Sequence, residues 1–152
     1  MPARTESASA TPQPGEGGPV DTRRAWKVLA LTSVAVLLAF LDVTIVNTAF
    51  PAICATFPGT SIDDLSWVLN AYNVVFAALL IPAGRLADRA GRRRVFFGGL
   101  GVFVVGSLLC GLAPTAELLI AARVLQAAGA AALIPASLGL ALPEFPPERR
   151  AV

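Results

Sequence analysis

The 152-residue sequence contains no histidine and has few charged residues, few cysteines and a single lysine. Charged residues make up 14% of the chain, whereas soluble domains usually carry about 25%. Without histidine there is no histidine-ligated metal site and no serine–histidine catalytic triad. Two cysteines, Cys54 and Cys110, are too few for a cysteine-based metal framework. No other nucleophile–base pair stands out, so we expect neither an enzyme nor a protein with a metal or cofactor.

Both cysteines fall near the same predicted end of the apolar segments described below. One interpretation is a disulfide between Cys54 and Cys110. The interpretation we favour is two unpaired thiols that behave as small apolar residues.

Apolar sequence, by contrast, is abundant, at 55% of all residues. Charge is concentrated in a few short segments, and the stretches between them are about 20 residues long, enough to cross a bilayer at ~1.5 Å per residue. Four helices are expected, at about residues 25–50, 65–83, 95–113 and 116–142. We therefore predict an all-α membrane protein whose transmembrane domain occupies residues 23–152.

The segment before the first helix has a different composition. Residues 1–22 are rich in Pro, Gly, Ser, Thr and Ala and show no apolar periodicity, which predicts a disordered cytoplasmic tail. It is not a signal peptide, because no apolar core and small-residue cleavage site follow at the usual distance. Pro51 is expected to close the first helix, and the segment from Ser61 to Asp64 to cap the second.

Basic residues gather at one end of the predicted helices. With the N-terminus inside, the tail and cytoplasmic loops hold 11 of the 12 basic residues, all but Arg123, and the outer loops hold only acids. Basic loops stay on the cytoplasmic side of a membrane. We expect a multi-pass protein of the cell inner (plasma) membrane with a cytoplasmic N-terminus. The net charge of +2 has this explanation and does not predict nucleic-acid binding.

A polar segment, residues 84–94, separates the second and third predicted helices. It reads Gly-Arg-Leu-Ala-Asp-Arg-Ala-Gly-Arg-Arg-Arg, with Asp88 between Gly84 and Gly91. A membrane hairpin needs some positive charge on its cytoplasmic turn, but it needs no glycine at both ends and no acid between them. The spacing therefore indicates a role beyond topology.

Two ionisable side chains fall well inside the predicted spans, Asp42 in the first and Arg123 in the fourth. A lone charge at mid-bilayer costs about 2.5–3.5 kcal/mol, so such residues usually pair or line a wet cavity. Both lie roughly 12 Å from the outer ends of their helices, at ~1.5 Å per residue, and would pair if those helices pack together. Gln126, one turn from Arg123, is placed to hold the guanidinium.

Two interpretations of this pair remain open. In the first it only fixes helix packing, as buried ion pairs often do. In the second Asp42 is a proton or cation relay, which loads and releases a proton as its accessibility changes during transport.

Three asparagines are candidate cavity-lining residues. Asn70 and Asn73 lie three apart on the second helix and either line a cavity or bond a neighbouring helix. Asn47 lies about 140° round the first helix from Asp42, at ~100° per residue, so the two need not share a site. Small residues are frequent in the third helix and over residues 127–132, which predicts close helix packing.

Three segments, in order, resemble the major facilitator superfamily, and in particular the fourteen-helix branch of its drug:proton antiporters. Residues 41–51 resemble the first-helix motif of that branch, with Phe50 where leucine is common. Residues 84–94 resemble the motif between helices 2 and 3. Residues 123–131 resemble the fourth-helix motif, with Ala127 in place of the usual glycine.

The resemblance implies that the four helices are equivalent to helices 1–4 of the superfamily's N-terminal half. It implies a proton-coupling role for Arg123, with Asp42 and Gln126 as its partners. It also implies that Asp88 holds the cytoplasmic side shut against a helix N-terminus of the other half, where an acid is favoured. The conformational-lock residues implied are Gly84, Asp88, Arg89, Gly91, Arg92 and Arg93.

The implied function is proton-coupled efflux of a lipophilic or cationic drug or metabolite. Complete members have twelve or fourteen helices, with substrate sites between two halves built from three-helix repeats. We therefore expect a truncated transporter, inactive by itself, whose partners are the bilayer, the proton, the cargo and the missing C-terminal helices.

Three alternatives remain. One is a symporter of the same superfamily. Another is a four-helix membrane subunit without transport activity of its own. The third is a four-helix exporter of the small multidrug resistance type, which would not need Arg123, the long tail or residues 84–94.

Overall fold

The structure, a computed structural model, describes residues 22–141. The predicted tail up to Asp21 and the polar segment from Leu142 onward lie outside the described residues. The described part is all-α, and each of its helices is long and apolar enough to cross a membrane, as predicted. The helices are α1 (Thr22–Thr56), α2 (Ile62–Ala90), α3 (Arg92–Gly111) and α4 (Ala116–Ala141).

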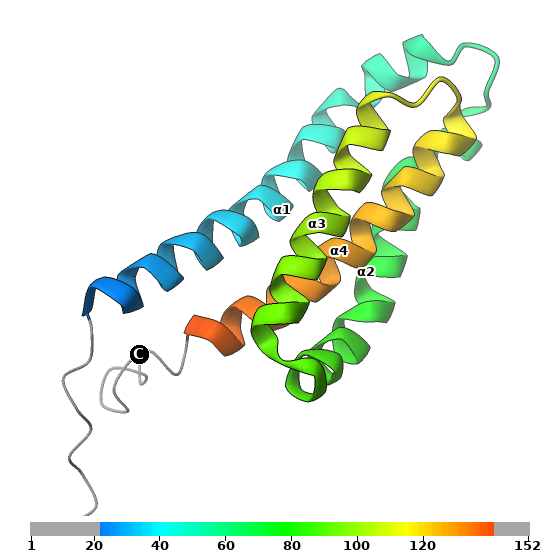
Figure 1. Cartoon of the computed structure of the whole chain (residues 1–152). Helices are drawn as coiled ribbons and strands as arrows, with labels where there is room; N and C mark the ends of the chain where they lie inside the picture. The colour runs from blue at the N-terminus through cyan, green and yellow to red at the C-terminus, as the bar shows by residue number, and fades with distance from the viewer. Residues whose placement is uncertain (1–21, 142–152) are drawn as a thin grey trace, which may run out of the picture.

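Consecutive helices run in opposite directions and form a bundle (Figure 1). The connections over residues 57–61 and 112–115 lie at one end of the bundle, and the junction of α2 with α3 lies at the other. Helix α4 packs against all three other helices, most extensively against α3. As a result α4 has the largest buried share and α1 the smallest.

The first helix is longer than predicted. Pro51 lies inside α1, which continues to Thr56, so the expected end at Pro51 is wrong. Proline removes one backbone hydrogen bond, and a membrane helix tolerates this loss when its surroundings compensate. At 35 residues α1 is about 52 Å long, more than the ~30 Å hydrocarbon core requires.

The junction between α2 and α3 also differs from the prediction. α2 continues to Ala90 and α3 begins at Arg92, so the loop predicted over residues 84–94 shrinks to Gly91. Arginine, leucine and alanine are good helix formers, which explains why the segment stays helical. Gly91 has φ 97°, and its N–H donates to the carbonyl of Ala87. That backbone conformation is open to glycine and strained for other residues.

The predicted cap of α2 is confirmed, although the helix starts three residues earlier than expected. The Ser61 hydroxyl oxygen accepts a hydrogen bond from the backbone N–H of Asp64 at 3.1 Å. The same hydroxyl donates to the Asp64 carboxylate at 2.7 Å. This reciprocal pair satisfies a helix-start donor that would otherwise lack a partner.

Glycines allow the backbones of α3 and α4 to touch, as the abundance of small residues predicted. A Cβ added to Gly129 would lie 2.5 Å from the backbone nitrogen of Phe103. A Cβ added to Gly106 would lie 2.8 Å from the Cα of Gln126. This close approach fixes Gln126, and with it the inward face of α4, against α3.

Candidate functional site

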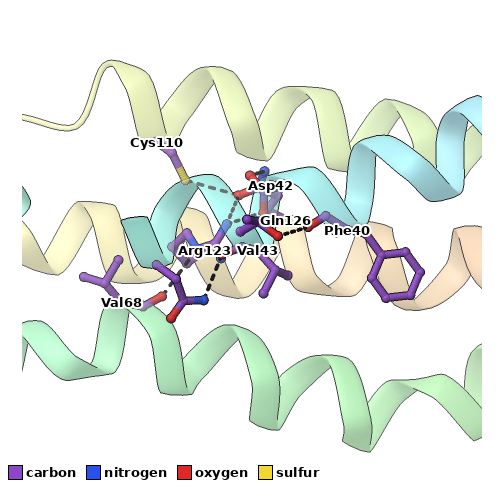
Figure 2. Close-up of polar contacts among 9 residues, drawn as sticks. Phe40, Asp42, Val43, Val68, Cys110, Arg123 and Gln126 are labelled. Atoms are coloured by element: carbon purple, nitrogen blue, oxygen red, sulfur yellow. Dashed lines mark hydrogen bonds and ion pairs between the residues drawn. The ribbon is translucent and has the colours of Figure 1, made fainter. Parts of the chain in front are cut away.

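An ion pair joins α1 to α4 within the membrane-spanning part of the bundle (Figure 2). Arg123 Nη1 donates to Asp42 Oδ2 at 2.6 Å. The Arg123 side chain is 2% exposed and that of Asp42 is 17% exposed. The predicted contact is therefore present, and the carboxylate is the partner that solvent can reach.

Gln126 completes a three-residue cluster with this pair. Its side-chain N–H donates to Asp42 Oδ1 at 2.8 Å, and its Oε1 accepts from Arg123 Nη1 at 2.8 Å. Arg123 and Gln126 lie three residues apart on α4, so they share one helix face. The expected role of Gln126 in holding the guanidinium has a direct geometric basis.

Three further groups contact the Arg123–Gln126 part of the cluster, and sequence reasoning did not find them. The Val68 carbonyl accepts from Arg123 Nε at 3.3 Å. The Tyr72 ring lies below the guanidinium, with its centroid 4.2 Å from Cζ, a cation–π contact. The Cys110 thiol donates to Gln126 Oε1 at 3.5 Å. Tyr72 is the only tyrosine of the chain and could have been singled out from the sequence, whereas nothing in the sequence distinguishes the carbonyl of Val68 from other backbone carbonyls.

The cluster leaves no buried polar atom unpaired. Among the residues that the structure describes, every buried side-chain nitrogen or oxygen has a hydrogen-bond partner. An unpaired charge here would be costly, because most of the surroundings are apolar helix surfaces. These bonds give the polar atoms of Asp42, Arg123 and Gln126 partners between the helices.

At the other end of the bundle, where α2 joins α3, the side chain of Arg92 in α3 bridges α2 and α4. Its Nε and Nη2 donate to Asp88 Oδ1 at 3.2 and 3.0 Å, and its Nη1 donates to the Gly139 carbonyl at 2.7 Å. A Cβ on Gly139 would collide with the Arg92 side chain. Gly139 therefore provides the space through which Arg92 reaches α4, a position that sequence reasoning did not single out.

Of the other predicted lock residues, Arg89 and Arg93 lie on the surface near this bridge, whereas Gly84 is partly buried against α4. Arg89 is exposed near the end of α2, and the Arg93 guanidinium lies 5.9 Å from the Phe97 ring centroid. Gly84 lies within α2, facing Pro135 of α4 at the distance of an ordinary contact. An open depression of about 910 Å³ covers residues 87–94 together with Phe97 and Leu140.

The three asparagines lie apart from the Asp42–Arg123–Gln126 cluster, and all three are exposed in the bundle. Asn47 donates to the Val43 carbonyl of its own helix at 2.8 Å. Both cysteines are free, so the interpretation as unpaired thiols holds and the disulfide alternative fails. Within residues 22–141 no group of three or more Cys, Asp and Glu side chains could hold a metal ion.

Comparison with known families decides the identity of this architecture. The family model described as Major Facilitator Superfamily matches residues 32–152. The chain belongs to the major facilitator superfamily. Its helices correspond to the first four helices of a superfamily N-terminal half, and the Asp42–Arg123–Gln126 cluster joins the first of these helices to the fourth.

Several superfamily members with curated names are similar to the chain. It is 44% identical over 147 residues to the methylenomycin A resistance protein of Streptomyces coelicolor, covering 97% of this chain and 30% of that protein. It is 42% identical over 128 residues to the multidrug efflux pump LfrA of Mycolicibacterium smegmatis, covering 82% of this chain and 25% of LfrA.

The probable multidrug resistance protein EmrY of Escherichia coli is 39% identical over 140 residues, with 92% of this chain and 26% of EmrY covered. The chain thus spans between a quarter and a third of the length of these relatives. No solved structure gives a significant match. This superfamily member is a multi-pass membrane protein, and the relatives named here are described as two resistance proteins and one efflux pump.

Proposed function

We propose that the chain forms the proton-coupling part of an efflux antiporter for lipophilic or cationic small molecules. The observation that supports this most is the Asp42–Arg123 pair, held inside the membrane with Arg123 2% exposed and Asp42 17% exposed. A carboxylate in this position can exchange a proton when its access to water changes, whereas the guanidinium stays charged. The names of the relatives, resistance and efflux proteins, support the direction of transport and the class of cargo.

In this proposal Asp42 binds the proton and Arg123 stabilises the carboxylate until the proton arrives. Protonation of Asp42 ends its charge interaction with Arg123. Gln126 Oε1 and the Val68 carbonyl still accept from the guanidinium, and the Tyr72 ring still lies against it. Arg123 thus keeps partners in both protonation states, so the cost of breaking the ion pair is reduced.

The arginine-rich junction of α2 and α3 acts as the cytoplasmic lock. Asp88 is 65% exposed beside the open depression, so its carboxylate is available to the N-terminus of a helix outside these four. Arg92 ties Asp88 to α4 through the Gly139 carbonyl, which couples the lock to the helix that carries Arg123. Arg89 and Arg93 add positive charge at this face and keep it cytoplasmic in the inner membrane, with the N-terminus on the same side.

Cargo contacts the exposed asparagines, Asn47 of α1 and Asn70 and Asn73 of α2. Transport requires further helices, because the chain spans 30% or less of the relatives named above and exposes many large apolar side chains. These helices complete the cavity between the two halves.

Inverted membrane vesicles test the proposal. The chain is fused to the part of LfrA that follows the corresponding helices, and addition of ethidium, a lipophilic cation, to acid-loaded vesicles is followed with a pH-sensitive dye. We expect ethidium to release protons from vesicles that contain the fusion, but not from vesicles that contain the chain alone. Asp42→Asn should abolish the release while the fusion still inserts.

Asp88→Asn in the same fusion should slow transport without abolishing its dependence on the proton gradient. Undiminished proton-driven export by the Asp42→Asn variant would contradict the proposal. Membrane insertion is checked by protease protection of each variant, so that a missing protein is not mistaken for a missing activity.

A further inference from the structure

A cavity of about 400 Å³ lies among all four helices, in the half of the bundle that ends in the short connections. Its mouth lies near the ends of the helices, where it is lined by Thr56 of α1 and Gly111 of α3. Its wall includes Ser107 and Cys110 of α3. The interior of the bundle is therefore hollow on this side of the ion pair, and the hollow is partly polar.

The deep end of this cavity is the ion-pair cluster. Asp42, Arg123 and Gln126 all line it. Asp42 precedes Thr56 by 14 residues, about 21 Å along α1, so the cavity connects the end of the helix to the middle of the membrane. A buried water needs only about 10–15 Å³ of such space and two to four polar partners, and the cavity has ample volume and polar side chains at Asp42, Ser107 and Gln126 among others.

The lining of the cavity does not include the three asparagines that we assign to the cargo. None of Asn47, Asn70 and Asn73 is among the described residues that line it, and α2 contributes Val68 instead. All three asparagines are exposed on the outside of the bundle. The cavity therefore leads to Asp42 from within the bundle without passing any of these three asparagines.

We propose that this cavity is the proton's route between the outer solution and Asp42, separate from the path of the cargo. The step is the transfer of one proton from a hydronium ion in the cavity to Asp42 Oδ2. An O–H bond forms on the carboxylate, one O–H bond of the hydronium breaks, and a water molecule remains. The inference rests on the proposed antiport function and adds the side from which the proton arrives.

The reactivity of the Cys110 thiol can be used to measure access to this cavity, because Cys110 lines it. Cys54 does not line the cavity, and Cys54→Ser leaves Cys110 as the only thiol of the chain. The fusion with LfrA helices, with any LfrA cysteines replaced by serine, is placed in right-side-out vesicles. A membrane-impermeant methanethiosulfonate is added outside, and thiols left unmodified are counted afterwards with a polyethylene glycol maleimide. We expect Cys110 to react from the outside.

A bulky side chain at the mouth of the cavity should slow the movement of protons through it. A Cβ on Gly111 meets no atom within 4 Å, so Gly111→Phe adds bulk to the cavity lining without a clash at its Cβ. Gly101 on the same helix is equally open and lies outside the cavity lining, which makes Gly101→Phe the matched control. We expect Gly111→Phe to slow both Cys110 labelling and ethidium-driven proton release at least roughly tenfold, equivalent to about 1.4 kcal/mol of added barrier.

Equilibrium binding of ethidium should be unchanged in Gly111→Phe, and Gly101→Phe should change none of the three measurements. Labelling of Cys110 only in inverted vesicles, or labelling and proton release that Gly111→Phe leaves as fast as the control, would overturn the inference. If Gly111→Phe fails to insert, Ser107→Leu narrows the same cavity from its wall and is held to the same outcomes. Labelling does not depend on transport, so failure of this inference is distinct from failure of the Asp42→Asn test.

Discussion

Removing only the acid of the Asp42–Arg123 pair should destabilise the bundle more than removing the whole pair. Asp42→Asn leaves Arg123 as an uncompensated cation that is 2% exposed. Breaking a buried ion pair in this way typically costs about 3–5 kcal/mol. We expect the lower end, about 3 kcal/mol, because polar groups in a membrane also find partners in the unfolded state.

The double variant Asp42→Asn, Arg123→Met also removes the guanidinium that Asp42→Asn alone would leave without a counter-charge. Methionine is unbranched and adapts to the space that the arginine stem fills. Replacement of buried ion pairs by apolar residues is often neutral or better, so the double variant should lie within about 1 kcal/mol of the original chain. Arg123→Met alone should cost less than Asp42→Asn, because the remaining carboxylate is 17% exposed and lines a cavity.

The assay is the free energy of unfolding, measured by reversible titration with a denaturing detergent and analysed as a double-mutant cycle. Asp88 and Arg92 supply the matched control cycle, with side chains 65% and 43% exposed. Their coupling should stay below about 1 kcal/mol, as for other surface pairs. If the effects at Asp42 and Arg123 add within about 0.5 kcal/mol, the two residues are not coupled in the folded protein and the reasoning about this site is refuted.

Three further predictions concern single residues. Gly129→Ala should lower the free energy of unfolding by about 1–3 kcal/mol, because its Cβ would strike the α3 backbone. Gly101→Ala should leave the free energy of unfolding unchanged or raise it. Equal effects of the two substitutions in thermal unfolding would contradict the close α3–α4 contact. Gly91→Ala should cost about 1–3 kcal/mol because of its positive φ, and Gly84→Ala, which sits in a helix with room for a methyl group, should cost less in the same assay. Asn47→Leu should change stability by no more than about 0.5 kcal/mol, since its amide bonds only a carbonyl of its own helix, yet it should reduce ethidium export by the LfrA fusion. Normal export by that variant would show that Asn47 does not contact the cargo.

The amino-acid sequence by itself indicated the four membrane-length helices that the structure shows within residues 22–141, because span length and low charge depend only on composition along the chain. It also indicated the Asp42–Arg123 contact, because two charges at similar depth in a bilayer have few other partners. Gln126 followed from helix periodicity. Each of these inferences rests on a local or one-dimensional property of the chain.

Other features depended on tertiary packing. The sequence suggested a loop over residues 84–94, but α2 and α3 remain helical up to Gly91, because packing against α4 and good helix formers outweigh the charge of the segment. Pro51 likewise does not end α1, since a proline removes only one backbone hydrogen bond and the remaining bonds keep the segment helical.

Only the three-dimensional structure decided which backbone groups and spaces surround the ion pair. The Val68 carbonyl and the Tyr72 ring belong to α2 and Cys110 belongs to α3, so their positions around the ion pair depend on how both helices pack against α4. The close approach of α3 to α4 is set by the absence of side chains at Gly106 and Gly129. Composition predicts that small residues bring helices together, but the register in which two surfaces interlock is a property of both surfaces at once.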